Sequence, residues 1–170
     1  MKLLTVLAMA LMFQQAPSKH PVISDTVAPL EYQLYSLWVD RNFGPAYAGN
    51  LYLLDQSKAV NPLAIPCANP TSSSHQNHDA YLYEELHALG EKTSPLLLKE
   101  NLQGMTRFSV ASTAPDTSDK VTVQFSRVAF SDEKDGALFV VIEKQKGRSD
   151  KTSLIFAHKA DDKWSFQLLC

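Results

Sequence analysis

The strongest constraint on the fold is a run of six consecutive apolar residues, Ala-Leu-Phe-Val-Val-Ile, at positions 137–142. The run is too short for a transmembrane helix, which needs about 20 apolar residues. It also lacks the polar alternation of a strand with one solvated face. This pattern predicts a central β-strand that is covered on both sides.

The segments around this run complete a predicted antiparallel meander of four strands. Residues 121–126 alternate apolar and polar, residues 152–157 carry Leu-Ile-Phe at their centre, and Trp164, Phe166 and Leu168 share one face. Polar residues at 132–135 and 161–163 provide hairpin turns. We therefore expect the sheet to end in this meander.

The alternation breaks at Arg127, which occupies a position where an apolar residue is expected. Because strand side chains repeat every two residues, such a slip predicts a β-bulge or burial on both faces. A buried guanidinium also needs a partner. The sequence leaves two interpretations open: an internal carboxylate, Glu31 or Asp40, or an anionic ligand in the concave face of the sheet.

Two amphipathic helices are predicted ahead of the meander. The first covers about 28–43, with Pro29 in its first turn and Asp25 or Thr26 as its cap, and the second covers 79–89 and ends at Gly90. Their expected core faces are Leu30, Leu34, Leu37 and Trp38, and Tyr81, Leu82, Leu86 and Leu89. Short strands are expected at 51–54, 96–98 and 105–111. The predicted fold class is α+β, with both helices packed on one face of a mostly antiparallel sheet.

The amino-terminal residues 1–16 have the layout of a secretory signal peptide, with Lys2 followed by an uncharged apolar stretch. Pro17 disfavours cleavage after Ala16, so cleavage nearby, for example after Ala10, and retention as an anchor both stay open. Residues 17–26 form a flexible lead-in and 27–170 a single domain. The predicted location is periplasmic or secreted, with no stable membrane span after signal cleavage.

The charge balance argues against two classes of partner. Charged residues make up 20% of the chain and the formal net charge is −2, which gives no electrostatic footprint for nucleic acid or an anionic membrane. The only two cysteines, Cys67 and Cys170, are expected to form a disulfide in an oxidising compartment. Two separate thiols are the alternative.

The segments Ser-Arg-Val-Ala-Phe-Ser at 126–131, Ala-Leu-Phe-Val-Val at 137–141 and Lys163-Trp164 resemble a family of small exported bacterial proteins of uncharacterised function. The resemblance implies export and the fold, but no activity. Many members carry a glycine- and cysteine-containing loop before the third strand. Residues 145–151 here have one glycine and no cysteine, so this protein departs from the family at that loop.

One cluster could carry metal chemistry. His75, His78 and Asp79 have the residue types of a zinc site, to which His87 could add a ligand, but a polar serine-rich loop is the alternative. Glu84 and His87 have the spacing of an ordinary helix-stabilising pair rather than of an acid–base dyad. The Ser131 to Lys134 spacing matches one motif of penicillin-binding enzymes without its partner motifs, and we attribute it to chance.

No complete catalytic constellation is present in the sequence, and no cofactor is implied. The leading hypothesis is a non-catalytic exported binding or accessory domain for an unknown protein or small-molecule partner, with Arg127, Tyr83 and Tyr47 as candidate ligand contacts. Both tyrosines are expected to be exposed. The alternatives are a metal-dependent periplasmic hydrolase using His75, His78 and Asp79, and a structural envelope component.

Overall fold

A computed structural model describes residues 26–65, 79–92 and 108–170. The chain order of its elements is α1 (Pro29–Asn42), η1 (Pro45–Tyr47), β1 (Leu51–Leu54), η2 (Pro62–Ala64), α2 (Asp79–Gly90), β2 (Ser109–Ala111), β3 (Val121–Phe125), β4 (Ala129–Phe130), β5 (Gly136–Gln145), β6 (Lys151–Ala160) and β7 (Lys163–Leu168). The predicted signal peptide and the strand expected at 96–98 lie outside the described residues.

The described strands form one mixed sheet in the order β2-β1-β3-β5-β6-β7, with β4 also paired to β5. Strand β1 is parallel to both β2 and β3, and every pairing from β3 to β7 is antiparallel. The α+β class and the carboxy-terminal meander are therefore confirmed. Of the strand expected at 105–111, the described part is β2.

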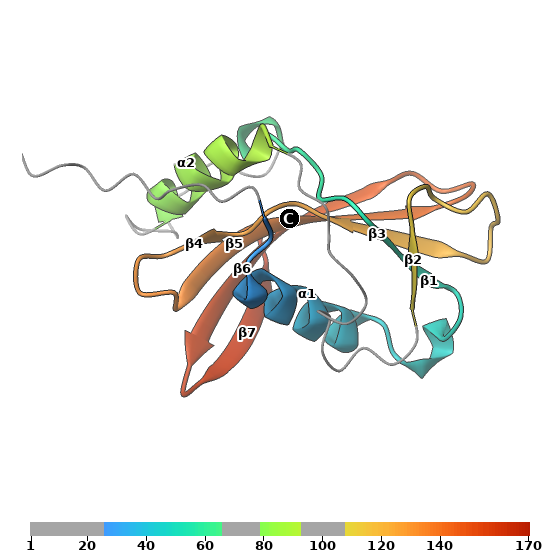
Figure 1. Cartoon of the computed structure of the whole chain (residues 1–170), viewed down its shortest axis with the longest axis horizontal. Coiled ribbons are helices and arrows are strands. Elements are labelled where there is room, and N and C mark those ends of the chain that lie inside the picture. Colours follow the sequence, from blue (N-terminus) through green and yellow to red (C-terminus); the bar gives the residue numbers. More distant parts are fainter. Residues whose placement is uncertain (1–25, 66–78, 93–107) are drawn as a thin grey trace, which may run out of the picture.

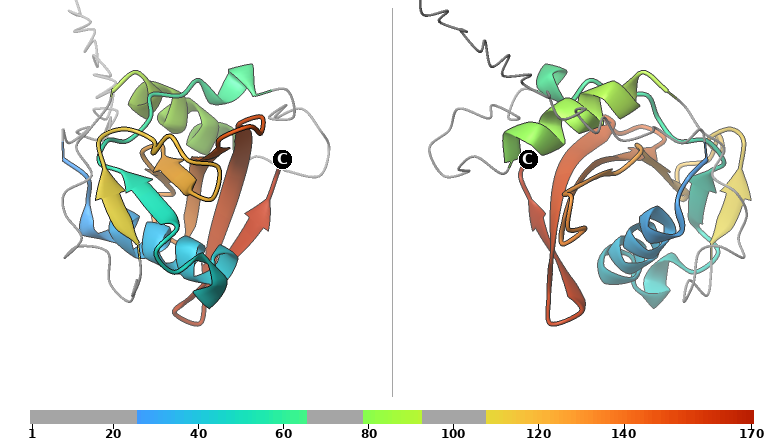
Figure 2. Two further views of the ribbon diagram at one scale, coloured as in Figure 1. Left: turned by 90° about the vertical axis from the view of Figure 1, so that its right-hand side faces the viewer. Right: turned by 60° about the vertical axis from the view of Figure 1, so that its left-hand side comes forward.

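The two helices pack on opposite faces of the sheet, so the expectation that they share one face is wrong. Helix α1 lies in the concave side, around which β5, β6 and β7 curve, and α2 lies across the other side (Figures 1 and 2). Alternate residues of β5 serve the two layers: Phe139 packs in the cluster of α1, and Leu138 and Val140 pack in the cluster of α2. This explains the unbroken apolar run, because both faces of β5 are covered, as predicted.

The predicted β-bulge occurs between β3 and β4. Four residue steps separate Phe125 from Ala129, but only three separate their partners on β5, Val141 and Leu138. The hydroxyl of Ser126 fills the gap in the ladder, since it accepts a hydrogen bond from the backbone N–H of Val140 (2.8 Å) and donates one to the carbonyl of Arg127 (2.7 Å). The extra residue turns Arg127 toward the concave face.

Helix α1 begins differently from the sequence prediction. Ala28 is the N-cap residue, and the Glu31 side chain accepts a hydrogen bond from its backbone N–H at 3.0 Å. The predicted core face is also incomplete: Leu34 and Trp38 are buried, but Leu37 is 39% exposed and Tyr35 is fully buried. The curved sheet surrounds more of the helix than a narrow apolar stripe would cover.

Helix α2 is present where it was predicted, but its buried face is rotated. Leu82, Leu86 and Leu89 are buried as expected, whereas Tyr81 is exposed and Tyr83 is buried. Gly90 is the last helical residue, and a Cβ there would collide with the backbone carbonyl of Val60. Glycine is thus required by a close backbone approach between α2 and the segment before η2.

Candidate functional site

A buried ion pair joins the bulge to α1. The Arg127 guanidinium contacts the Glu31 carboxylate through Nε, at 3.0 and 3.2 Å, and through Nη2 at 2.9 Å, and it also donates to the carbonyl of Thr26 at 3.1 Å. Both side chains are almost inaccessible to water, with exposed fractions of 5% and 2%. This geometry is the predicted structural pair, with Glu31 rather than Asp40 as the partner.

Further donors complete the environment of the Glu31 carboxylate. It accepts hydrogen bonds from the Val128 backbone N–H at 2.9 Å and from the Tyr35 hydroxyl at 3.2 Å, and that hydroxyl lies 2.7 Å from the Ser126 carbonyl oxygen. Burial and the neighbouring Glu31 charge raise the pKa of Tyr35 well above its usual value, so its proton stays in place. The pair holds the bulge against α1 and offers no open cation to a ligand.

The two candidate tyrosines have opposite environments. Tyr83 is buried in the α2 core, so the expectation that it is exposed is wrong. Tyr47, at the end of η1, is 40% exposed and packs edge-on against Phe43 with 5.1 Å between ring centroids. Of the three predicted ligand contacts, Tyr47 is therefore the one with accessible surface.

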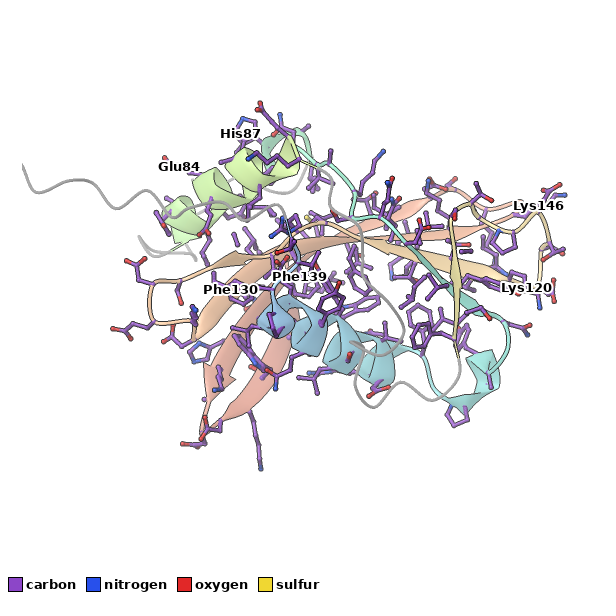
Figure 3. All side chains as sticks on the ribbon, viewed as in Figure 1. Glu84, His87, Lys120, Phe130, Phe139 and Lys146 are labelled. Atoms are coloured by element: carbon purple, nitrogen blue, oxygen red, sulfur yellow. The ribbon has the colours of Figure 1, made fainter. Side chains whose placement is uncertain are left out.

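The predicted metal cluster is not placed by the structure, because His75, His78 and the side chain of Asp79 lie outside the described residues. Within the described ranges, no three His, Cys, Asp or Glu side chains are grouped to bind a metal ion. The Glu84 and His87 side chains lie on the side of α2 that faces away from the sheet (Figure 3). The hydrolase interpretation consequently stays a prediction.

A second, half-buried carboxyl group lies between α2 and the β4–β5 hairpin. One oxygen of Glu85, Oε2, is buried without a hydrogen-bond partner, while the Phe130 backbone N–H donates to the carboxyl group. Burial first, and then the nearby Asp132 charge, raise the pKa of Glu85 to about 7. A pKa near 7 leaves Glu85 partly protonated at neutral pH.

Ser131 has a structural role in the predicted hairpin turn at 132–135. Its hydroxyl lies 2.7 Å from Asp135 Oδ1 and accepts hydrogen bonds from the backbone N–H groups of Asp135 and Gly136 at 3.2 and 2.9 Å. Ser131 therefore stabilises the turn between β4 and β5.

Aromatic and cationic side chains line a groove between η1 and the β5–β6 hairpin. This groove of about 510 Å³ is lined by Phe43, Ala46, Tyr47, Asn50, Asp119, Val121, Glu143, Lys144, Gln145, Arg148, Ser149 and Lys151. We call it the aromatic-cationic groove. No histidine or cysteine is among these lining residues.

Arg148 is the distinctive cation of this groove. Lys144 pairs with Asp150 (3.5 Å) and Lys151 pairs with Glu143 (3.1 Å), but the Arg148 side chain makes no ion pair or hydrogen bond with the described residues. The preceding Gly147 has φ +79°, in the left-handed region that favours glycine. This turn, closed by a 3.0 Å bond from the Arg148 N–H to the Gln145 carbonyl, presents the guanidinium to solvent.

Sequence reasoning missed Arg148 although a signal was available. The hairpin segment at 144–151 contains three lysines and one arginine around a single glycine, which is a dense basic cluster for a chain of net charge −2. What the sequence could not provide is the partner surface, because Phe43 and Tyr47 come from a segment about 100 residues earlier. The groove exists only once η1 is folded against the hairpin.

Cys170 follows β7, where its carbonyl accepts a 3.3 Å bond from the Leu154 N–H and its side chain packs against the α2 core. No free cysteine occurs among the described residues. Cys67 lies outside them, so the pairing of Cys67 with Cys170 stays a prediction.

Comparison with known proteins adds no identification: no protein-family model matches the chain, and no significant match was found among curated proteins or solved structures. The resemblance to exported bacterial proteins therefore stays a prediction. In the part of the chain that the structure describes, no helix is both long and apolar enough to cross a membrane.

Proposed function

We propose that the protein is a non-catalytic binding domain that acts outside the cytoplasm, and that the aromatic-cationic groove holds its ligand. The observation that carries this proposal is the Arg148 guanidinium, which has no partner among the described residues and lies in the same groove as the exposed Tyr47 ring. An exposed arginine forms bidentate hydrogen bonds with carboxylates and phosphates. An aromatic ring contributes a flat apolar surface at little entropic cost.

The chemistry of the groove indicates a small ligand with an anionic oxygen group and a flat apolar part. Three cations and two carboxylates line the groove, which leaves one excess positive charge. Because Lys151 and Lys144 already have carboxylate partners, that excess is centred on Arg148. The volume of about 510 Å³ is in the range of small-molecule pockets.

The export part of the proposal rests on the sequence: the signal-like residues 1–16, the resemblance to exported proteins and the predicted Cys67–Cys170 disulfide all favour a periplasmic or secreted protein. Labelling with a membrane-impermeant reagent in intact cells would test it. Protection of the protein from that reagent until the cells are lysed would contradict export.

Phenyl phosphate is a suitable probe for the groove, with inorganic phosphate and phenol as its two halves. In a chemical-shift titration we expect saturable changes at Tyr47 and Arg148, and tighter binding of phenyl phosphate than of either half. Arg148→Gln should weaken binding about tenfold, and Tyr47→Ala should weaken it several-fold.

Tyr81→Ala provides a matched control, because Tyr81 is a similarly exposed tyrosine on α2 rather than in the groove. It should leave the affinity unchanged. Equal affinities for wild type, Tyr47→Ala and Arg148→Gln would contradict the proposal, as would shift changes confined to other parts of the molecule.

A further inference from the structure

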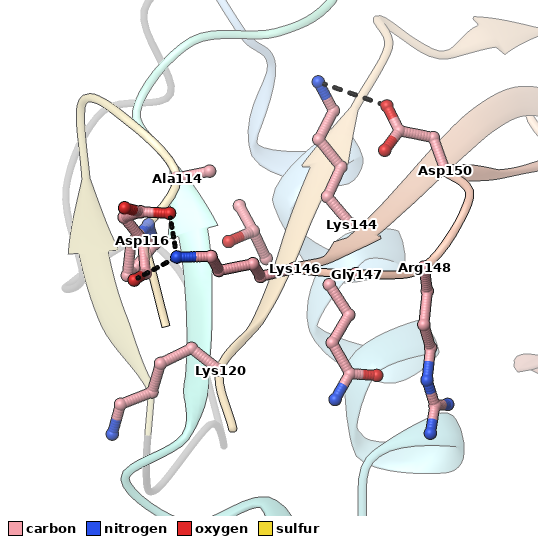
Figure 4. Close-up of a pocket in the computed structure, with 11 residues that line it drawn as sticks. Ala114, Asp116, Lys120, Lys144, Lys146, Gly147, Arg148 and Asp150 are labelled. Atoms are coloured by element: carbon pink, nitrogen blue, oxygen red, sulfur yellow. Dashed lines mark hydrogen bonds and ion pairs between the residues drawn. The ribbon is translucent and has the colours of Figure 1, made fainter. Parts of the chain in front are cut away.

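A second cleft adjoins the aromatic-cationic groove and has a different chemical character. It has a volume of about 320 Å³ and lies between the loop at 114–116 and the β5–β6 hairpin (Figure 4). The two share Lys144, Gln145 and Arg148, but Lys146, Lys120 and Thr122 line only this second one. We call it the cationic cleft and propose that it binds a compact oxyanion of the phosphate class, with pyrophosphate as its best simple representative.

The charge of the cleft supports an anion. Four cations, Lys120, Lys144, Lys146 and Arg148, line it against two carboxylates, Asp116 and Asp150. Two positive charges are therefore in excess among the lining residues, and Asp119 of the adjoining groove pairs with one of these cations, Lys120, at 3.5 Å. Lys120 and Lys146 lie together at the end of the sheet that is remote from α2 (Figure 3). Ala114 and Pro115 are the apolar members of the lining, so an apolar ligand gains little there.

The cationic groups are already held in place. Lys146 Nζ lies 2.8 Å from Asp116 Oδ1 and 3.4 Å from the Asp116 carbonyl oxygen, and Lys144 Nζ lies 3.5 Å from Asp150. Lys120 Nζ is fixed by Asn50 Oδ1 at 2.8 Å and by the Gly49 carbonyl at 3.3 Å. Arg148 has no such contact among the residues drawn in Figure 4. These side chains therefore lose less conformational entropy when an anion binds.

The ion pairs of the cleft do not prevent anion binding. The Asp116 side chain is 89% exposed and Asp150 is 56% exposed, and exposed ion pairs contribute little free energy because water screens them. An oxyanion with two or more charges can replace a single carboxylate at each lysine and can also engage Arg148. The carboxylates then keep the empty cleft neutralised and compete with weakly charged anions, which favours multiply charged ones.

Titration calorimetry of the full protein with inorganic pyrophosphate tests the inference. We expect saturable binding that is tighter than for chloride or acetate and that weakens as salt rises, because the contacts are ionic. Lys146→Gln and Lys144→Gln should each weaken binding about tenfold. Asp116→Asn should strengthen it several-fold, because it frees Lys146 from its competing partner.

Two further variants separate this inference from the proposed function. Lys163→Gln removes an exposed lysine at the start of β7, which is not part of the cleft, and should leave pyrophosphate affinity unchanged. Tyr47→Ala should also leave pyrophosphate affinity unchanged, while it weakens the binding of phenyl phosphate. Absence of saturable pyrophosphate binding at low salt would overturn the inference, and so would equal losses for Lys146→Gln and Lys163→Gln.

Discussion

At the scale of single residues, Arg127 and Glu31 form the best-defined polar centre of the described chain. An arginine inside an apolar strand pattern predicts a buried pair, and the pair is present. The sequence could not choose between Glu31 and Asp40, because both lie on the same predicted helix. The choice depends on the bulge, which directs both the guanidinium and the Val128 N–H at the first turn of α1.

Removing one member of this ion pair should lower the free energy of unfolding much more than removing both. Arg127→Met leaves the Glu31 carboxylate buried without its counter-charge, and we expect a loss of about 3–5 kcal/mol in the free energy of unfolding. The double variant Glu31→Gln with Arg127→Met carries no buried charge and should be more stable than Arg127→Met alone. Urea denaturation followed by circular dichroism measures both. A loss under about 1 kcal/mol for Arg127→Met would show that the pair does not stabilise the fold.

Glu85 should make stability depend on pH in the opposite sense to an ordinary acidic residue. Its pKa rises from 4.5 to about 7 on folding, chiefly through burial. The contribution of protonated Glu85 to the free energy of unfolding is therefore fully present below about pH 4.5 and is lost as the pH rises through about 7. Because the group is only half-buried, we expect Glu85→Gln to be about 1–2 kcal/mol more stable than wild type near pH 8 and nearly equal near pH 4.

Thermal unfolding across this pH range provides the measurement, and Glu84→Gln is the matched control because Glu84 is the exposed neighbour on the same helix. Glu84→Gln should follow the wild-type curve at each pH. A Glu85→Gln variant that shows the same stability difference near pH 4 and near pH 8 would mean that the Glu85 proton is not linked to folding.

At the scale of elements, patterns with period two predicted more than patterns with helical period. The alternation along β3 and β7, the apolar runs of β5 and β6 and the break at Arg127 predicted the strands and the bulge, because a strand residue has only two faces to choose from. Helix faces are less sharply determined. Tyr81 and Tyr83 lie two positions apart on α2, and which of them is buried depends on how β4, β5 and η2 meet the helix. The surrounding elements, not the helix sequence, decide it.

The turn between β6 and β7 gives the element-scale prediction. Ala160 pairs with Lys163, so Asp161 and Asp162 form a two-residue loop, and both have positive φ, at 49° and 60°. This is the geometry in which Asn-Gly is the preferred pair. Replacing Asp161-Asp162 by Asn-Gly should raise the free energy of unfolding by about 0.5–1 kcal/mol, although it removes the exposed 3.0 Å pair of Asp162 with Lys159.

Differential scanning calorimetry would report this change as a higher melting temperature. The opposite substitution, Asp161→Val, places a β-branched residue at positive φ and should lower the free energy of unfolding by about 1–2 kcal/mol. If both variants had the same melting temperature as wild type, the β6–β7 turn would not contribute to the stability that this measurement reports.

At the scale of the whole molecule, the amino-acid order alone did not predict which face each helix covers. The sequence contained the information that β5 is covered on both sides, and α1 and α2 are the layers that cover it. The aromatic-cationic groove is equally non-local, since it joins η1 to the β5–β6 hairpin. Sequence reasoning identified Tyr47 as exposed but could not predict that Arg148 lies in the same groove. Local periodicity predicts helices and strands, not contacts between distant segments.

The last prediction concerns the link between the carboxyl terminus and the central segment. Cys170 is anchored beside β6 by the Leu154 backbone bonds and contacts the core of α2. A bridge from Cys67 to Cys170 closes a loop of about 100 residues, for which the chain-entropy model gives up to about 4.7 kcal/mol. We expect the protein from an oxidising compartment to have a mass lower by two hydrogens than the dithiol. We also expect reduction, or the Cys67→Ser and Cys170→Ser double variant, to lower the free energy of unfolding by about 2–4 kcal/mol. The reducing agent should not change the stability of the double variant, which separates the bridge from other effects of the reagent. A dithiol mass in that preparation would contradict the bridge and weaken the case for export, since disulfides form and persist in oxidising compartments.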